Sequence, residues 1–216
     1  MKGADSIDAA VARGVELADM GCDAIEVTLD SPGWKDILIG LRASLPPRVL
    51  LGVGTVMDET VSHVGTAASL GATFALSPID PVGFIDECHR HGVLAVPSGF
   101  TSNEWYDLHR RGAKMVKLFH AGLVPPATLK SMLGVTPLGE QMCIMPSGGV
   151  SPKNAPDWWD AGACVLGMGS NLVGDDLNAT PGTPVHEAAA AKWQAEGRHV
   201  ARELFERARA RAAKMP

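Results

Sequence analysis

A chain of 216 residues is long enough for one large domain or two small ones, and 46% hydrophobic with 20% charged residues is typical of a folded globular protein. The formal net charge of -5 gives no reason to expect a nucleic-acid partner, and no apolar run reaches the length of a membrane span. The amino terminus lacks a signal-peptide core, so we expect a cytoplasmic protein, whereas a transit peptide removed before residue 1 would leave no trace. The four cysteines show no zinc-like pairing and are expected to be free thiols in a reducing compartment.

One unit repeats along the chain: a helical segment, then a glycine, then a short apolar strand. The first helix is expected to begin at residues 5–6. The unit then covers residues 19–27, 69–76, 90–96, 110–116 and 160–166. A glycine just past a helix end suits a C-cap, because glycine adopts the left-handed conformation without a Cβ penalty. Two further apolar runs at residues 49–53 and 142–145 bring the expectation to about seven strands.

Strands that alternate with helices in this way predict βαβ units and a parallel sheet. Thr101 and Ser151 are expected to cap two of the helices. Two architectures fit, an open doubly wound sheet and an eight-stranded barrel, and the even units without a second domain favour the barrel. The prediction is therefore an α/β protein with a (βα)8 TIM-barrel fold over residues 1–216. Its first strand would be truncated or missing, because residues 1–3 are too short, and an amphipathic helical extension would follow from about residue 174.

Polar residues inside two of the strands are expected to face the interior of the barrel. Alternation along residues 24–30 directs Ile25, Val27 and Leu29 toward the helices. The same alternation directs Glu26, Thr28 and Asp30 into the lumen. On the strand around residue 117 it directs Lys117 inward with Met115 and Phe119. A lysine and a glutamate would thus share one cavity.

Three interpretations of Lys117 are open. The lysine could lie on an edge strand with its amine reaching water, or form a buried ion pair with Glu26 that only packs. Buried ion pairs are poor stabilisers, so the second interpretation is the weaker one. The third is a desolvated amine that forms a Schiff base with a carbonyl substrate while Glu26 moves protons.

Glycine-rich loops follow three of the strands, at residues 52–55, 146–150 and 167–171. The last two follow the last two strands, where barrels commonly hold a phosphate group through backbone N–H groups. His120 either lines the mouth of the cavity or lies on the surface, and Trp34 is expected over its rim. No group of residues has metal-ligand spacing, so no metal is predicted.

Four short motifs carry a family resemblance. They are Glu-Val-Thr-Leu at residues 26–29, Gly-Val-Gly-Thr at 52–55, Val-Lys-Leu-Phe at 116–119 and Pro-Ser-Gly-Gly-Val at 146–150. In this order and spacing they resemble the 2-keto-3-deoxy-6-phosphogluconate/6-phosphogalactonate aldolases, over residues 3 to 173 or so. The resemblance implies a trimeric (βα)8 barrel with class I chemistry that needs neither a metal nor a cofactor.

The same resemblance implies roles for individual residues. Lys117 matches the Schiff-base lysine and Glu26 the general acid/base. The residues matched to substrate binding are Thr55, which holds the pyruvate half, Pro97 after the preceding strand, and the phosphate loops with Ser147, Gly148, Gly149, Gly169 and Ser170.

The chain also departs from the family at several positions. Asp30 stands where the phosphogluconate branch has an arginine for the substrate carboxylate, and residues 30–34 look more like the phosphogalactonate branch. That branch takes a basic residue from its first strand, where only Lys2 is present. His120 stands where proline is common. The carboxylate contact and the preferred C4 epimer are therefore left open.

The expected function is a carbon–carbon lyase that cleaves 2-keto-3-deoxy-6-phosphogluconate, or its galactonate epimer, to pyruvate and D-glyceraldehyde 3-phosphate, as in the Entner-Doudoroff pathway. Its partners would be this phosphorylated keto acid, pyruvate and two further copies of the chain, with no nucleic acid and no membrane. A metal- or carboxylate-dependent phosphosugar isomerase or epimerase on the same barrel stays open as an alternative. So does a non-catalytic phosphometabolite-binding protein.

Overall fold

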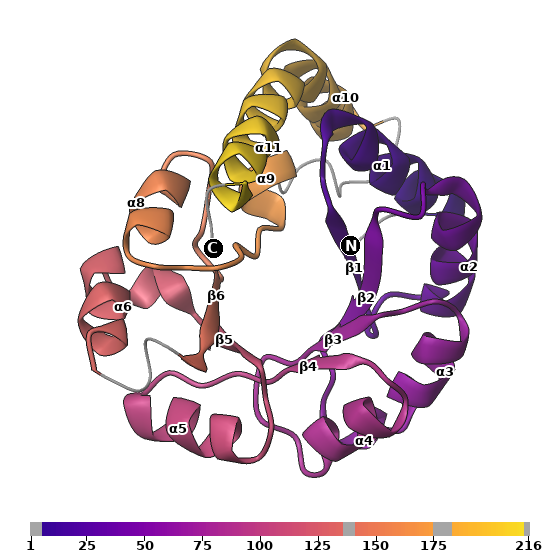
Figure 1. The fold of residues 1–216 in the computed structure, drawn as a ribbon. Coiled ribbons are helices and arrows are strands. Elements are labelled where there is room, and N and C mark those ends of the chain that lie inside the picture. Colours follow the sequence, from indigo (N-terminus) through magenta and orange to yellow (C-terminus); the bar gives the residue numbers. More distant parts are fainter. Residues whose placement is uncertain (1–5, 136–140, 175–182, 214–216) are drawn as a thin grey trace.

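Parallel strands curve around an inner space while the helices lie outside them (Figure 1). The computed structural model describes residues 6–135, 141–174 and 183–213. The strands are β1 (Ala24–Thr28), β2 (Leu50–Gly54), β3 (Phe74–Leu76), β4 (Leu94–Val96), β5 (Met115–Phe119) and β6 (Cys143–Ser147). Within these residues no helix is long and apolar enough to cross a membrane.

The strands follow one another in chain order around the curve. β1 to β4 form a parallel four-stranded sheet, and β5 pairs with β6 in a parallel two-stranded sheet. Backbone hydrogen bonds link the two sheets: the Lys117 N–H donates to the Pro97 carbonyl at 2.9 Å, and the Gly99 N–H donates to the Lys117 carbonyl at 3.1 Å. The carboxyl ends of all these strands therefore open toward the same side.

The first and the last of the predicted strands have different outcomes. The unit expected over residues 160–166 forms in part: α8 ends at Asp160 and Gly162 has a φ of 105°, but the apolar run after that glycine is not a full strand. The Cys164 N–H donates to the Ile144 carbonyl at 3.1 Å, and the only bridge beyond β6 in the described chain joins Ser147 to Gly167. Glycine supplies no side chain to pack and weakens a strand, which accounts for the short pairing. The expected first strand falls within residues 1–5, outside the described residues.

The helices mostly alternate with the strands, as expected from the repeat. They are α1 (Ile7–Met20), α2 (Trp34–Ser44), η1 (Asp58–Thr60), α3 (His63–Ser69), α4 (Phe84–Arg90), α5 (Ser102–Arg110), η2 (Ala121–Leu123), α6 (Pro126–Leu133), α8 (Ala155–Asp160), α9 (Ser170–Val173), α10 (Pro184–Lys192), the π-helical turn η4 (Trp193–Gly197) and α11 (Arg198–Ala212). Thr101 caps α5 through a side-chain hydrogen bond, as predicted. Ser6 likewise caps α1, which begins at Ile7, next to the predicted start. Ser151 does not cap a helix, because α8 begins only at Ala155.

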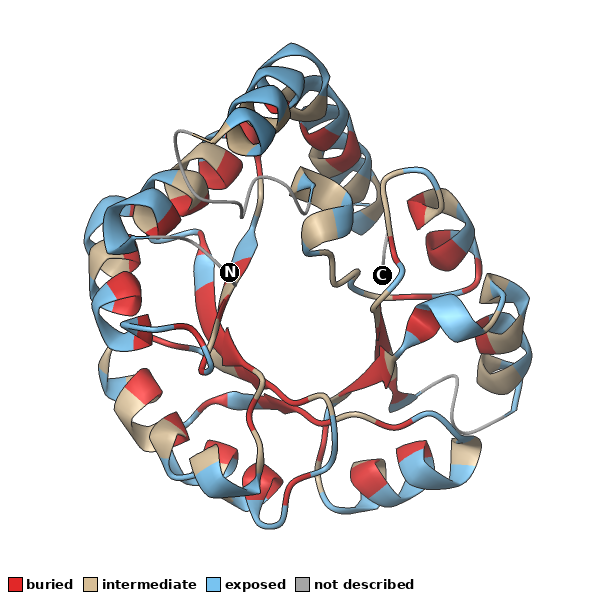
Figure 2. Ribbon diagram, turned by 180° about the vertical axis from the view of Figure 1, so that it is seen from behind, coloured by how far each residue is buried: buried red, intermediate tan, exposed pale blue. Residues whose placement is uncertain are grey.

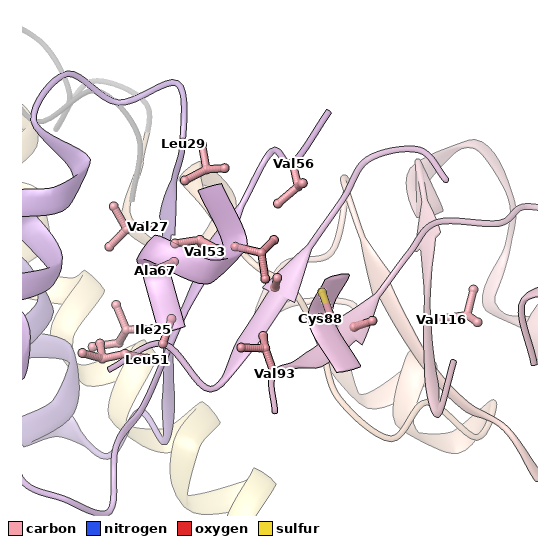
Figure 3. Close-up of a cluster of buried hydrophobic side chains, with 14 of the residues drawn as sticks. Ile25, Val27, Leu29, Leu51, Val53, Val56, Ala67, Cys88, Val93 and Val116 are labelled. Atoms are coloured by element: carbon pink, nitrogen blue, oxygen red, sulfur yellow. The ribbon is translucent and has the colours of Figure 1, made fainter. Parts of the chain in front are cut away.

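The main hydrophobic core lies between the strands and the helices. Ile25 and Val27 on β1, Leu51 on β2 and Val116 on β5 all point outward into it (Figure 3). Buried segments consequently follow the strands and the inner faces of the helices (Figure 2). Each buried aliphatic side chain of this kind stabilises the fold by about 1.5–3 kcal/mol. The predicted alternation is confirmed for the apolar residues of β1 and β5, whereas Asp30, predicted to face the lumen, lies in the turn after β1 and is exposed.

A second, smaller apolar cluster fills part of the space inside the curve of strands. It consists of Leu76, Val96 and Met145, with Phe74 and Met115 packed against it. The Phe74 ring reaches across β2, because a Cβ at Gly52 would stand only 2.2 Å from that ring. The inner space thus has an apolar floor, and Met145 within it is paired in register with Lys117.

The C-terminal helices connect the two ends of the curve (Figure 1). Trp193 is buried with Leu17 and Met20 of α1, while Leu204 on α11 packs with Trp159 of α8. The Trp193 indole donates to Glu16 Oε1 at 3.1 Å. Helix α11 therefore lies against both the first helix and the helix after β6.

We expect Trp193→Ala to lower the free energy of unfolding by about 3–5 kcal/mol, because it leaves a large cavity beneath the C-terminal helices. Urea unfolding followed by circular dichroism measures the change. Val185→Ala on the exposed face of α10 is the matched control and should stay within about 0.5 kcal/mol of the wild type. Equal losses in the two variants would show that the contact with α1 contributes no stability.

Candidate active site

Lys117 lies in the middle of β5 with its side chain directed into the inner space. The residue is only 7% exposed. Burial lowers the pKa of its ammonium group, and the nearby Glu26 carboxylate raises that pKa by a smaller amount, so the net direction is downward. Its Nζ lies 4.3 Å from the centroid of the Phe119 ring. More of this amine is therefore neutral, and nucleophilic, than on an exposed lysine at the same pH.

Glu26 occupies the inner face of β1, beside a glycine of β2. Thr28 of β1 is paired in register with Gly54, and the Glu26 side chain lies over that glycine. A Cβ built at Gly54 would stand 1.4 Å from Glu26 Oε1, so no other residue fits there without moving the carboxylate. Gly54 is thus part of the site, because its missing side chain is the space that Glu26 fills.

Thr55 follows β2 directly and has a backbone φ of 57°. It is the one non-glycine residue with a positive φ in the described chain. A β-branched residue in this region is an outlier that costs about 1–3 kcal/mol, and such strain is concentrated at functional sites. The conformation supports the interpretation of Thr55 as a ligand-binding residue.

The glycine loops after β5 and β6 pack directly on each other. Gly148 and Gly149 follow Ser147 with φ values of 77° and 97°, and the Gly122 N–H donates to the Gly148 carbonyl at 2.7 Å. A Cβ at Gly149 would stand 2.7 Å from the Gly122 Cα. The loop can therefore contain only glycine at this contact.

The last predicted loop joins the same group. Gly169 and Ser170 begin α9, and Asn171 next to them donates through Nδ2 to the Val150 carbonyl at 3.1 Å. A Cβ at Gly167 would stand 2.8 Å from Ser147 Oγ. The two loops predicted to hold a phosphate group are thus adjacent to each other and to the end of β5.

Pro97 contributes to the site through its backbone. Its carbonyl accepts the Lys117 N–H, and the following residue, Ser98, donates its hydroxyl to the Ser77 carbonyl at 2.7 Å. These bonds fix β5, and with it the lysine, to the neighbouring strands. Sequence reasoning placed Gly54 and Asn171 in two of its glycine-rich loops without giving either a role, and it did not single out Gly122. The contacts of all three join segments far apart in the chain.

The prediction that Trp34 covers the rim of the site is wrong. Trp34 is 8% exposed and lies in the main core, where its ring centroid is 5.8 Å from that of His63 on α3. Asp30 is exposed after β1, beside the hydrogen-bonded hydroxyls of Thr28 and Ser31. Lys2, the other candidate for the substrate carboxylate, lies outside the described residues.

A cavity of about 510 Å³ lies next to the part of the inner space that surrounds Lys117. It is bounded by the loops after β3 and β4 and by α5, and it shares Phe119 with the surroundings of Lys117 but does not include the amine. The described residues contain no group of three or more His, Cys, Asp or Glu side chains that could hold a metal ion.

Comparisons with known proteins agree on one family. A family profile described as "KDPG and KHG aldolase" matches residues 4–182. The chain is 28% identical to the 2-dehydro-3-deoxy-6-phosphogalactonate aldolase of Escherichia coli, over 76% of this chain and 78% of that protein. It is 27% identical to the 2-dehydro-3-deoxy-phosphogluconate aldolase of Treponema pallidum, over 71% of each chain.

Solved structures resemble the whole chain. The structure described as "Native KDPGal structure" has a TM-score of 0.77 at 25% identity and covers 100% of this chain and 94% of its own. An N-acetylmannosamine-6-phosphate 2-epimerase from Clostridium perfringens has a TM-score of 0.61 at 14% identity, over 79% and 82%, which shows a common fold alone. The fold is accordingly α/β and TIM-barrel-like.

We expect Glu26→Gln to lower the pKa of Lys117 further. The carboxylate favours the ammonium form, so its removal leaves the effect of burial unopposed. Acetylation by acetic anhydride at a series of pH values, quantified for each lysine by mass spectrometry, gives the pH at which the amine becomes reactive. Lys153, which is exposed, is the internal control and should not shift. A shift of Lys117 toward higher pH would contradict the electrostatic coupling.

Proposed function

The chain belongs to the KDPG and KHG aldolase family, and on that basis we propose that it is a class I aldolase. Its reaction is the cleavage of 2-keto-3-deoxy-6-phosphogluconate, or its galactonate epimer, to pyruvate and D-glyceraldehyde 3-phosphate. The observation that carries this proposal is the burial of the Lys117 amine beside the Glu26 carboxylate. The names of the curated relatives, which include both epimers, support the substrate class.

The first half of the reaction forms the covalent intermediate. The Glu26 carboxylate first takes a proton from the Lys117 ammonium group, and the neutral Nζ then attacks the C2 carbonyl carbon. A proton passes from nitrogen to oxygen, which gives the carbinolamine. Glu26, in its protonated form, donates a proton to the C2 hydroxyl, which leaves as water. The product is an iminium ion on Lys117, and Glu26 is now a carboxylate.

The second half breaks the carbon–carbon bond. The Glu26 carboxylate accepts the C4 hydroxyl proton, the C3–C4 electron pair moves into the iminium, and glyceraldehyde 3-phosphate departs. Glu26 then returns the proton to C3 of the enamine, and water hydrolyses the resulting iminium to pyruvate and the free amine. Thr55 holds the pyruvate half. The phosphate lies on the backbone and hydroxyl groups of Ser147, Gly148, Gly149, Gly169 and Ser170.

We further propose that residues 1–216 act as a single cytoplasmic domain that assembles as a homotrimer. A designed cage made "by fusing symmetric oligomeric domains" resembles the chain with a TM-score of 0.78 at 24% identity, over 99% of this chain and 73% of that one. Its description mentions symmetric assembly, which is consistent with an oligomer.

Incubation with pyruvate and sodium borohydride tests the covalent step. We expect the wild-type chain to gain one reduced pyruvyl group by intact mass, and peptide mapping should place it on Lys117. Lys117→Met should gain none, because the thioether fills the space without an amine. Lys114→Met, on an exposed residue of the same segment, is the matched control and should be labelled fully. An epimerase or a binding protein would form no adduct. A separate measurement, turnover of the two C4 epimers side by side, identifies the better substrate.

Gly54→Ala tests the position of Glu26. We expect the new methyl group to displace the carboxylate and to lower the exchange of pyruvate methyl protons with solvent about 100-fold, since a shift of about 1 Å can cost that much. The exchange is followed by proton NMR in deuterated water. Overpacking should cost only about 1–3 kcal/mol, which thermal unfolding measures. Normal exchange in a folded variant would exclude Glu26 as the proton carrier.

A further inference from the structure

His120 occupies a position that the family resemblance leaves without a role. It follows β5 directly, its side chain is exposed, and its ring stacks on that of Phe119 with 3.7 Å between the centroids. Its Nδ1 is 3.2 Å from the point where a Cβ of Gly148 would stand. The imidazole is therefore in the space directly over the first glycine of the loop after β6.

The same two aromatic rings connect this loop with the reacting amine. Phe119 lies 4.3 Å from Lys117 Nζ, and its ring also contacts the space over Gly148. His120 follows the last residue of β5, so it lies beyond Lys117 toward the open ends of the strands, with its ring against that of Phe119. An extended substrate joined to Nζ through C2 would pass Phe119 and bring its far end, which carries the phosphate group, close to His120.

The chemistry at this position differs from that of a proline. A proline side chain offers no hydrogen-bond donor, whereas an imidazole offers a ring N–H. Hydrogen bonds to a charged acceptor such as phosphate are stronger than neutral ones. The Gly148–Gly149 loop contributes only backbone groups, so His120 would add a side-chain donor to it.

We propose that His120 binds the terminal phosphate of the substrate and so sets the preference of this chain for phosphorylated over unphosphorylated keto acids. The inference rests on the proposed function, since it takes the glycine loop as the phosphate site. It assigns His120 a binding role and leaves the proton transfers with Glu26.

Two substitutions distinguish the contribution of the aromatic ring of His120 from that of its N–H group. His120→Phe keeps an aromatic ring on Phe119 but removes the donor, whereas His120→Asn keeps a donor near the position of Nδ1. We expect His120→Phe to lower kcat/KM for the phosphorylated substrate about tenfold, mainly through KM, because one charge-assisted hydrogen bond is lost. Its kcat/KM for the unphosphorylated keto acid should be unchanged. His120→Asn should recover most of the loss.

A binding measurement keeps this inference separate from the proposed function. Titration of each variant with inorganic phosphate, followed by phosphorus NMR, should show about tenfold weaker binding in His120→Phe than in the wild type, whether or not cleavage occurs. Equal phosphate binding in the two, or an equal loss with both keto acids, would overturn the role of His120. Failure of the wild type to form the pyruvate adduct would overturn the aldolase and leave the phosphate result to be judged on its own.

Discussion

The burial of one amine in the middle of β5 is the constraint on which the inner face of the sheet depends. An unpaired ammonium in an apolar interior is costly, so Lys117 loses part of its preference for the charged form. The nearby Glu26 carboxylate limits that loss, but this half-buried carboxylate also needs space. Gly54 provides this space, since any side chain at that position would collide with Glu26. The chemistry therefore depends on Gly54 of β2 as well as on Lys117.

The interior is divided into an apolar floor and a polar upper layer, and the division has an electrostatic consequence. Leu76, Val96 and Met145 form this floor, and Met145 is paired in register with Lys117. Charges act on each other more strongly where water is excluded, so this floor strengthens both the desolvation of Lys117 and its coupling to Glu26. The parallel direction of the strands then places the glycine loops beside the reacting groups on the same side.

A feature of the fold or of the site could be predicted from the sequence where it is determined within one short segment, and not where it depends on contacts between distant segments. Alternation within one strand is local, and it correctly directed Glu26 and Lys117 inward. The contact of Glu26 with Gly54 depends on the pairing of β1 with β2, which the spacing of motifs does not give. Trp34 was misplaced for the same reason: it is buried in the main core, where it meets residues of other segments such as His63 on α3. The strand expected at the end of the unit over residues 160–166 does not form in full, because apolar content alone does not show that this segment makes only one bridge, from Gly167 to Ser147.

The C-terminal helices connect the two ends of the strand series. The described strands form two sheets, and their outer strands, β1 and β6, are not paired with each other. Arg209 on α11 contacts Asp23, just before β1, at 3.0 Å, and Leu204 packs on α8, just after β6. Exposed ion pairs contribute little, so the apolar contacts of Trp193 and Leu204 dominate this connection. Since β1 carries Glu26 and β5 carries Lys117, a helix that holds the two ends of the curve together also fixes the separation of the acid from the amine. The stability of a segment distant from the site thereby becomes a condition of its chemistry.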